Sequence, residues 1–410
     1  MTKKEEKTPF TESEVLRRNL PSIGAAVRMI IIFTSVLSIP LTAAKVLELS
    51  QDQTSSWIMS LYGFSALLGI ALTIKYRQPI LITGNIFFII FISGLEGQIG
   101  YPELIGASII AGAAVAIVGL VGLTERLTSY IPVPIVYGLL AGAVLPFVTD
   151  LFTNLGVSTL IVGGTLLAYL LSRRFLGNRL PAILPALITG LICSAYTGQF
   201  EQFQSQLHFT IPKLTMPVFS LQAIITAAPV FFVLITIQSN LPSIRFLQSQ
   251  EYEPPELVIS VISGVGTIIG SFLGPIGVSL SLPATSLVAG LGAGEKETRH
   301  RSVYISGLFA VFVGLFASIA VGLASVIPLV LLLTLAGLSV VNVLENSLQQ
   351  VTQGPLTLGP LFTFAITVSE ISFLGYGPYF WALFIGTGVS LLLERDGLKK
   401  LRDQVKKNKH

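Results

Sequence analysis

A few polar residues set in apolar surroundings are the groups that could do chemistry in this sequence. Asn85 opens one apolar run, and Gln238 and Asn240 lie two residues apart at the end of another. Side-chain amides both donate and accept hydrogen bonds. Glu370 is the one carboxylate placed clearly within an apolar stretch, and an acid there is a candidate for proton transfer. Such groups can bind and release a small solute or a proton without changing covalent bonds.

Residue patterns typical of enzymes do not accompany these polar groups. The three histidines, His208, His300 and His410, have no spacing that would build a metal site. The sequence shows no nucleophile with a plausible base and no phosphate-binding motif. We therefore expect no catalytic residues, no metal and no cofactor, and we expect an ion gradient rather than ATP to supply energy.

Apolar helices must hold these polar residues. Hydrophobic residues make up 52% of the chain and charged residues 11%, and the mean hydropathy is +0.79, which is far from the balance of a soluble globular protein. A run of about 20 apolar residues crosses a bilayer core. The sequence predicts an all-α polytopic membrane protein with about fourteen transmembrane segments. They are expected at 23–44, 57–74, 79–93, 103–122, 133–150, 156–172, 181–197, 218–238, 255–273, 276–291, 303–322, 324–343, 356–373 and 375–393.

The basic residues indicate the orientation, because Lys and Arg concentrate on the cytoplasmic side of membrane proteins. With both termini in the cytoplasm, 22 of the 25 basic residues fall in inside segments; Lys45 and Lys213 fall outside, and Arg28 lies in the first span. The net charge of +4 is then a topology signal, and we infer no nucleic-acid binding from it. We expect a multi-pass protein of the cytoplasmic membrane with cytoplasmic tails at 1–20 and 395–410.

Prolines and short motifs recur at matching positions in the two halves of the chain. Pro79 opens the third segment, and Pro275 opens the tenth 196 residues later. Two further motifs recur at nearly the same offset, Ile131-Pro132 with Leu140-Ala141-Gly142 and Ile327-Pro328 with Leu335-Ala336-Gly337. Seven spans in each half would make an inverted repeat, as in many secondary transporters. We predict repeat 1 over 21–197, an external linker over 198–217 and repeat 2 over 218–394; the alternative is chance recurrence in a Leu-, Ala- and Gly-rich chain.

The third and tenth segments are short and begin irregularly. In the third, a β-branched stretch after Pro79 gives way at Gly84-Asn85 to a helical run, and Asn85 is suited to an N-cap. In the tenth, apolar and small residues alternate from Gly274 until Pro283, which suits a first helical turn. We predict a short strand and then a half-helix in each, although both segments can also be read as ordinary helices that follow a loop proline.

Paired interruptions of this kind point to a binding site. Extended backbone at membrane depth is tolerated only inside protein or beside a wet cavity. The N-terminal ends of half-helices present free N–H groups and a positive dipole end, which favour an anionic group such as a carboxylate.

Several stretches carry a resemblance to a known family. They are Gln238-Ser239-Asn240-Leu241-Pro242-Ser243 with Leu247 and Tyr252, and Phe362-Thr363-Phe364 through Ser369, Leu374-Gly375-Tyr376-Gly377 and Phe380-Trp381. Over most of its length the chain resembles the benzoate/proton symporters, which share their fold with uracil and xanthine permeases. The first stretch is similar to the Gln-Asn-Leu-Pro element that ends the eighth span in that family.

The resemblance implies that the spans form two domains. Spans 1–4 and 8–11 would form a core domain, spans 5–7 and 12–14 a gate domain, and substrate would sit between them near the short strands of spans 3 and 10. A homodimer is plausible by analogy with the fold. The substrate contacts it implies are Thr83, Gly84, Asn85, Gln238, Asn240, Ser279, Ser281 and Thr285.

From these features we predict a secondary active transporter that imports a small organic carboxylate, such as benzoate, with protons. Glu370 is the candidate for proton coupling, unless it simply reaches water at the outer end of span 13. Gln238 stands about where the related nucleobase permeases have a carboxylate, so a proton-linked acid is missing from that position. A carrier of neutral nucleobases or inorganic anions on the same scaffold is the first alternative, and an uncoupled channel is the second. The run Glu295 to Arg301 is expected to be an ordinary cytoplasmic loop, with a gating role as its alternative.

Overall fold

The computed structural model describes residues 12–124, 131–177, 180–200 and 209–407. Helices dominate, and the described residues contain one two-stranded sheet. The elements before residue 200 are α1 (Glu12–Val36), α2 (Ser38–Val46), α3 (Gln51–Ile58), the π-helix η1 (Met59–Phe64), α4 (Ser65–Tyr76), β1 (Ile82–Gly84), α5 (Ile86–Ser93), α6 (Tyr101–Leu120), α8 (Val133–Val157), α9 (Thr159–Phe175) and α10 (Ile183–Tyr196).

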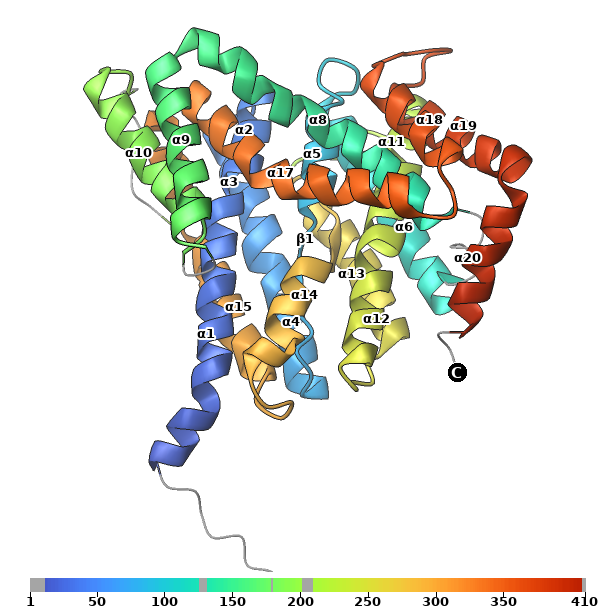
Figure 1. The fold of residues 1–410 in the computed structure, drawn as a ribbon, viewed down its shortest axis with the longest axis horizontal. Coiled ribbons are helices and arrows are strands. Elements are labelled where there is room, and N and C mark those ends of the chain that lie inside the picture. Colours follow the sequence, from blue (N-terminus) through green and yellow to red (C-terminus); the bar gives the residue numbers. More distant parts are fainter. Residues whose placement is uncertain (1–11, 125–130, 178–179, 201–208, 408–410) are drawn as a thin grey trace, which may run out of the picture.

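The elements after residue 209 are α11 (Leu221–Val233), the π-helix η2 (Leu234–Asn240), α12 (Leu241–Ser249), α13 (Glu256–Ser271), β2 (Val278–Leu280), α14 (Leu282–Ala289), the short 3₁₀-helix η3 (Leu291–Ala293), α15 (His300–Leu315), α16 (Ala317–Val326), α17 (Leu329–Gln353), α18 (Leu358–Val368), α19 (Pro378–Leu393) and α20 (Arg395–Lys407). Figure 1 shows β1 near the middle of the molecule, between α17 and α14 in this view, with α9 and α10 at one side and α18 and α19 at the other.

Long apolar helices identify the chain as a multi-pass membrane protein. Within the described part, six helical stretches are long and apolar enough to cross a bilayer, and α15 and α16 together would make a seventh if this pair, bent by 69°, is one span. The six are Arg18–Val46, Gln51–Tyr76, Tyr101–Leu120, Val133–Val157, Leu221–Ser249 and Leu329–Gln353. The apolar helices α10, α13, α18 and α19 are shorter. The count of fourteen spans and the inverted repeat stay predictions.

Several predicted span boundaries differ from the ends of the helices; α17, for example, continues to Gln353, ten residues past the predicted end at 343. The eighth span was expected to end at 238, but the helix continues through η2 to Ser249, because a π-helical turn takes up the position before Pro242 and lets the chain stay helical. The expected break between the eleventh and twelfth spans lies at Pro328, so α17 begins at Leu329 instead of 324. The thirteenth helix ends at Val368, five residues before its predicted end at 373.

The strand and half-helix predicted in both short segments are present. β1 and β2 pair antiparallel, with Ile82 opposite Leu280 and Gly84 opposite Val278. β2 is buried along its whole length, so the backbone groups on its side away from β1 need partners inside the protein. The hydroxyl of Thr267 accepts a hydrogen bond from the Val278 N–H at 2.9 Å. Side chains of neighbouring helices therefore complete this sheet in place of further strands.

The hairpin of α18 and α19 is closed by one carboxylate. Glu394, just after α19, accepts hydrogen bonds from the N–H groups of Thr357, Leu358 and Gly359 at 2.6, 2.8 and 2.9 Å, and from the Ser390 hydroxyl at 2.8 Å. Burial raises the pKa of Glu394, but these donors together outweigh it, so the pKa lies below its ordinary value. The ionised carboxylate therefore stabilises the fold above an ordinary pKa of about 4.3, and this contribution is lost as the pH falls through the lowered pKa.

Candidate functional site

Asn85 joins β1 to the half-helix α5. The residue is buried and has extended backbone angles, and its backbone N–H donates to the Gly277 carbonyl at 2.7 Å. Its side-chain oxygen accepts hydrogen bonds from the N–H groups of Phe87 and Phe88 at 3.0 and 3.3 Å. The predicted N-cap is confirmed, because these two bonds satisfy N–H groups that a helix leaves free at its first turn.

The amide nitrogen of Asn85 ties three segments together. It donates to the Ser239 hydroxyl at 2.9 Å, to the Leu234 carbonyl at 3.2 Å and to the Ser279 hydroxyl at 3.3 Å. Ser239 in turn donates to the side-chain oxygen of Gln238. A single buried side chain thus links β1, β2 and the π-helix η2, so the relative positions of the two broken segments depend on it.

The π-helix η2 decides which polar residue of its stretch faces the centre. Gln238 was expected near an inner helix end, but it lies within the 29-residue helical stretch Leu221–Ser249. Ser239 lines the central cavity, and Gln238 does not. A π-turn holds more residues than an α-turn, so the faces of η2 do not follow the 3.6-residue period. Sequence reasoning missed Ser239 for this reason; the only signal was its place inside the polar stretch.

Asn240 holds β2 from the side opposite β1. Its side-chain oxygen accepts a hydrogen bond from the Leu280 N–H at 2.9 Å, and its nitrogen donates to the Ser263 hydroxyl at 3.0 Å. The side chain is buried and does not line the cavity. Asn240 therefore positions β2, and its side-chain oxygen and nitrogen both bond to groups of the protein.

A cavity of about 180 Å³ lies beside the paired strands. It is lined by residues of α1, α2, η1, α4, β1, α5, α14, α15 and α17, with Ser239 from η2. Four predicted residues line it, namely Thr83, Gly84, Asn85 and Ser281. An apolar cavity of roughly 150 Å³ is enough to bind one benzene molecule in an engineered lysozyme, so this space suits a single aromatic ring.

The remaining predicted residues lie beside the cavity without lining it. Ser279 is buried and bonded to Asn85. Thr285, on α14, is fully buried, and its hydroxyl oxygen has no hydrogen-bond partner among the described residues. The structure thus brings all eight predicted residues to one neighbourhood and divides them into cavity-lining groups and groups that support the strands.

The two half-helices differ at the end that each presents to this neighbourhood. The first turn of α5 is capped by Asn85. At α14 the residue in the N-cap position is Ser281, whose side chain accepts no capping hydrogen bond, and Pro283 in the first turn has no N–H. No side chain caps the first turn of α14, so the N–H groups that remain beside Pro283 and the positive end of the helix dipole lie beside the cavity, and both favour an anion.

Aromatic and hydroxyl groups complete the lining. Phe33 and Tyr62 meet edge to face with centroids 5.8 Å apart, and the Tyr62 hydroxyl donates to the Phe33 carbonyl at 3.1 Å. Ser339 lines the cavity from α17. Sequence reasoning did not select these residues, because nothing in an apolar helix distinguishes a cavity-facing aromatic residue from one in the core. The described residues that line the cavity include no charged side chain.

Glu370 lies outside this site. It was expected within the thirteenth span, but α18 ends at Val368. Glu370 follows in an exposed turn with a positive φ of 53°. Burial in an apolar span was the reason for considering it, and the structure removes that reason. Its part in proton coupling stays a prediction.

The family is settled by comparison of the whole chain. The family model of the benzoate membrane transport protein matches residues 18–392. The chain belongs to that family. It is 29% identical over 368 residues to the benzoate membrane transport protein of Acinetobacter baylyi, which covers 89% of this chain and 93% of the relative. It is 25% identical over 357 residues to the inner membrane protein YdcO of Escherichia coli, with 86% and 90% covered. A membrane transporter, and not an enzyme, is therefore the class of this protein.

Solved structures share the fold. The transmembrane domain of the cyanobacterial bicarbonate transporter BicA matches with a TM-score of 0.61 and 17% identity, covering 93% of this chain and 98% of that one. SLC26A9 matches with a TM-score of 0.62 and 15% identity, covering 92% of this chain and 65% of that one. At these identities the likeness establishes the fold alone.

Proposed function

We propose that this transporter imports a small aromatic carboxylate such as benzoate. The observation that carries the proposal is the cavity, which combines the volume of one aromatic ring with an apolar and aromatic wall and the uncapped first turn of α14. The ring would pack against Phe33 and Tyr62, and the carboxylate would meet the helix end at Ser281. The name of the Acinetobacter relative agrees with this substrate.

The mechanism that we propose moves a gate domain against a core domain. The core would comprise spans 1–4 and 8–11 and the gate spans 5–7 and 12–14, arranged as two inverted repeats of seven spans with both termini in the cytoplasm. Two features support the repeat. The first is that β1 and β2 pair antiparallel. The second is that α8 and α17 are both 25 residues long, begin directly after Pro132 and Pro328, and pack against each other. The cavity is lined by both proposed domains, since α17 belongs to the gate.

Proton coupling is part of the proposal, and the site constrains it. The described residues that line the cavity include no carboxylate or histidine. The substrate carboxylate itself would then be the group in the cavity that can carry a proton. Glu370 is the alternative carrier of the proton. Replacing it with glutamine leaves uptake driven by a pH gradient intact if the proton travels with the substrate, and abolishes that dependence if Glu370 carries it.

Uptake by purified protein in liposomes tests the proposal. With an inward proton gradient, radiolabelled benzoate should accumulate, and collapsing the gradient should remove the accumulation. Excess unlabelled benzoate should compete, whereas uracil, xanthine, sulfate and bicarbonate should not. Competition by nucleobases or inorganic anions alone would retain the fold and reject the substrate. Currents without saturation or exchange would identify a channel.

A further inference from the structure

The end of α14 away from the cavity is held by side chains from other segments. Arg299 is only 6% exposed. Its Nη1 donates to the carbonyl of Ala289, the last residue of α14, at 2.7 Å, and its Nε donates to the Gly294 carbonyl at 2.8 Å. The same Nη1 reaches the side-chain oxygen of Gln250, after α12, at 3.3 Å. One buried guanidinium thus spans the end of α14, the following loop and α12.

Other side chains bind neighbouring carbonyls of the same stretch. Ser302 donates to the Val288 carbonyl at 3.3 Å. From α1, Arg28 donates to the Gly292 carbonyl at 3.1 Å and Ser22 to the Ala293 carbonyl at 2.8 Å. We call Arg299, Ser302, Arg28 and Ser22 the carbonyl clamp.

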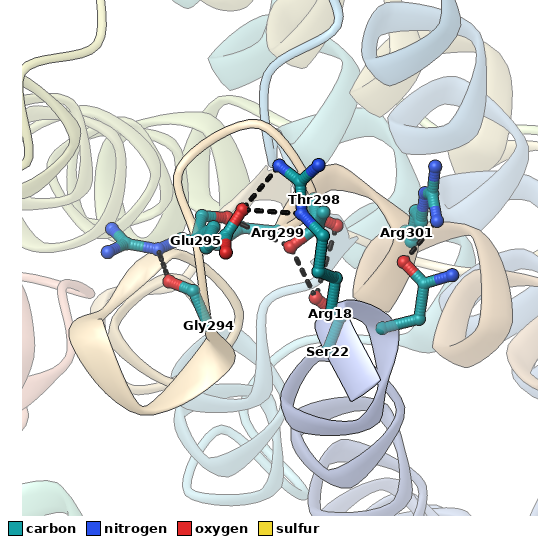
Figure 2. A network of polar contacts seen from close by, with 8 residues as sticks. Arg18, Ser22, Gly294, Glu295, Thr298, Arg299 and Arg301 are labelled. Carbon is teal, nitrogen blue, oxygen red and sulfur yellow. Dashed lines mark hydrogen bonds and ion pairs between the residues drawn. The ribbon is translucent and has the colours of Figure 1, made fainter. Parts of the chain in front are cut away.

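The loop after α14 is also tied to the start of α1. Arg18 pairs with Glu295 at 2.5 Å, and Arg301 donates to Asn19. Figure 2 shows the side chains of α1 and of the loop meeting around Glu295 and Thr298. The run from Glu295 to Arg301 is therefore a fixed contact between segments, and not a freely solvated loop.

The other half-helix ends differently. After α5, the carbonyls of Ile90 and Ile92 accept from the backbone N–H groups of Gly94 and Leu95 at 3.3 and 3.0 Å. Among the described residues, no charged side chain is bonded to the last turn of α5. Thus α5 has a cap at its cavity end and no clamp at its far end. In α14 the arrangement is reversed, with a clamp at the far end and no side-chain cap at the cavity end.

There is a physical reason why α5 has a cap and no clamp while α14 has a clamp and no cap. A helix of eight residues is only about 12 Å long, so fixing one end fixes the other. A capping side chain at Ser281 would occupy the N–H groups that a carboxylate needs, and α14 must therefore be positioned from its far end. A guanidinium there also complements the negative end of the helix dipole. Burying that charge is costly unless its donors are satisfied, and the carbonyls of Ala289 and Gly294 and the side chain of Gln250 accept from its Nη1 and Nε.

We propose that Arg299 is a positioning residue of substrate binding, which holds α14 by its last carbonyls so that its first turn meets the substrate carboxylate. This inference rests on the proposed function, because it assigns the carboxylate to the α14 end. Arg299 does not line the cavity and acts through the helix.

Two variants and a matched control test the proposal. Arg299→Ala removes both carbonyl bonds, and Arg299→Lys keeps a charge that can reach one of them. Arg301→Ala is the control, because Arg301 lies two residues away, is exposed, and bonds through its side chain to Asn19 rather than to α14. In the purified protein, Arg299→Ala should weaken benzoate binding about tenfold, which is the effect of about 1.4 kcal/mol. Arg299→Lys should recover part of the affinity, and Arg301→Ala should match the wild type.

Hydrogen exchange of the α14 amides provides a readout that needs no substrate. Arg299→Ala should speed exchange over Leu282–Ala289 and leave α5 unchanged. If the alanine variant does not fold, the lysine variant still tests the proposal through the same two measurements. Wild-type affinity and wild-type exchange in Arg299→Ala would overturn the positioning role, as would a loss of affinity that Arg301→Ala shares. If the wild type binds no carboxylate, the proposed function fails, and the exchange measurement still decides whether Arg299 fixes α14.

Discussion

A negative charge moved along β1 would show where the substrate carboxylate binds. The register pairs Ile82 with Leu280, so one further step places Ser281 opposite Leu81. Thr83 and Asn85 then lie two and four residues along β1 from the first turn of α14. At about 3.4 Å per residue, these positions are about 7 Å and 14 Å away. Both residues line the cavity, so a charge at either position faces the same ligand at a different distance.

The expected magnitudes follow from Coulomb's law. With an effective dielectric constant of about 20, two like charges about 7 Å apart repel by about 2.4 kcal/mol, and about 14 Å apart by about 1.2 kcal/mol. Thr83→Asp should therefore weaken benzoate binding about 50-fold, and Asn85→Asp about 8-fold. Asn85→Asp keeps the oxygen that caps α5 but loses the nitrogen that donates to Leu234, Ser239 and Ser279. The loss that this variant shows for a neutral analogue is therefore subtracted before the effect of the charge is judged. Thr83→Asn is the uncharged control for Thr83→Asp.

Titration calorimetry of the purified variants at pH 8 measures these affinities. The neutral analogue benzamide serves as a second control, because its binding should not respond to either charge. A larger loss in Asn85→Asp than in Thr83→Asp would place the carboxylate at the α5 end and refute our assignment. Equal and small losses in both variants would show that no carboxylate binds in this cavity.

Three further predictions concern the supports of the site and of the fold. Gly84→Ala would place a methyl group within 2.7 to 2.9 Å of η1 atoms, backbone included. Unfolding in detergent should therefore show that the stability falls by about 1–3 kcal/mol. Gly156→Ala is the control and should show no loss of stability, because a methyl group there would have nothing within 4 Å. Asn240→Ala leaves the buried N–H of Leu280 without its acceptor and should destabilise the protein by about 1–3 kcal/mol, with a matching loss of uptake; unchanged thermal stability would contradict its support of β2. Glu394→Gln should lower Tm at pH 7, and this difference from the wild type should shrink as the pH falls below about 4.3; a difference that is constant with pH would show that the charge of Glu394 does not matter.

The local elements of the site could be predicted from the sequence because their signals are local. Pro79 and Pro283 interrupt apolar runs, a proline fixes its own backbone angle and lacks an N–H, and asparagine favours the N-cap position. These preferences act over a few residues, so strand and half-helix could be expected in both broken segments. The polar stretch around Gln238 and Asn240 could likewise be selected, since polar side chains within a membrane cost free energy and usually have a functional or structural role.

Boundaries were less predictable where backbone hydrogen bonding changed within a helix. The eighth span was expected to end at 238, where the resemblance places the end of that span, but the π-helix η2 keeps the chain helical as far as Ser249. Residue type alone does not reveal a π-turn, because its extra residue is stabilised by contacts with other segments. The thirteenth span was overestimated for the opposite reason, since the residues after Val368 are apolar enough to continue a helix that the turn at Glu370 ends.

The sequence by itself determined that this chain crosses a membrane repeatedly and that two of its apolar runs are interrupted, because hydropathy and proline act locally. Only the tertiary structure decided what each polar group does there. The Asn85 oxygen caps its own helix, the Asn240 oxygen binds β2, and of the two half-helices only α14 has no side-chain cap at its first turn. Hydrogen-bond partners far apart in the chain set these roles, and their distances and directions exist only once the segments have packed.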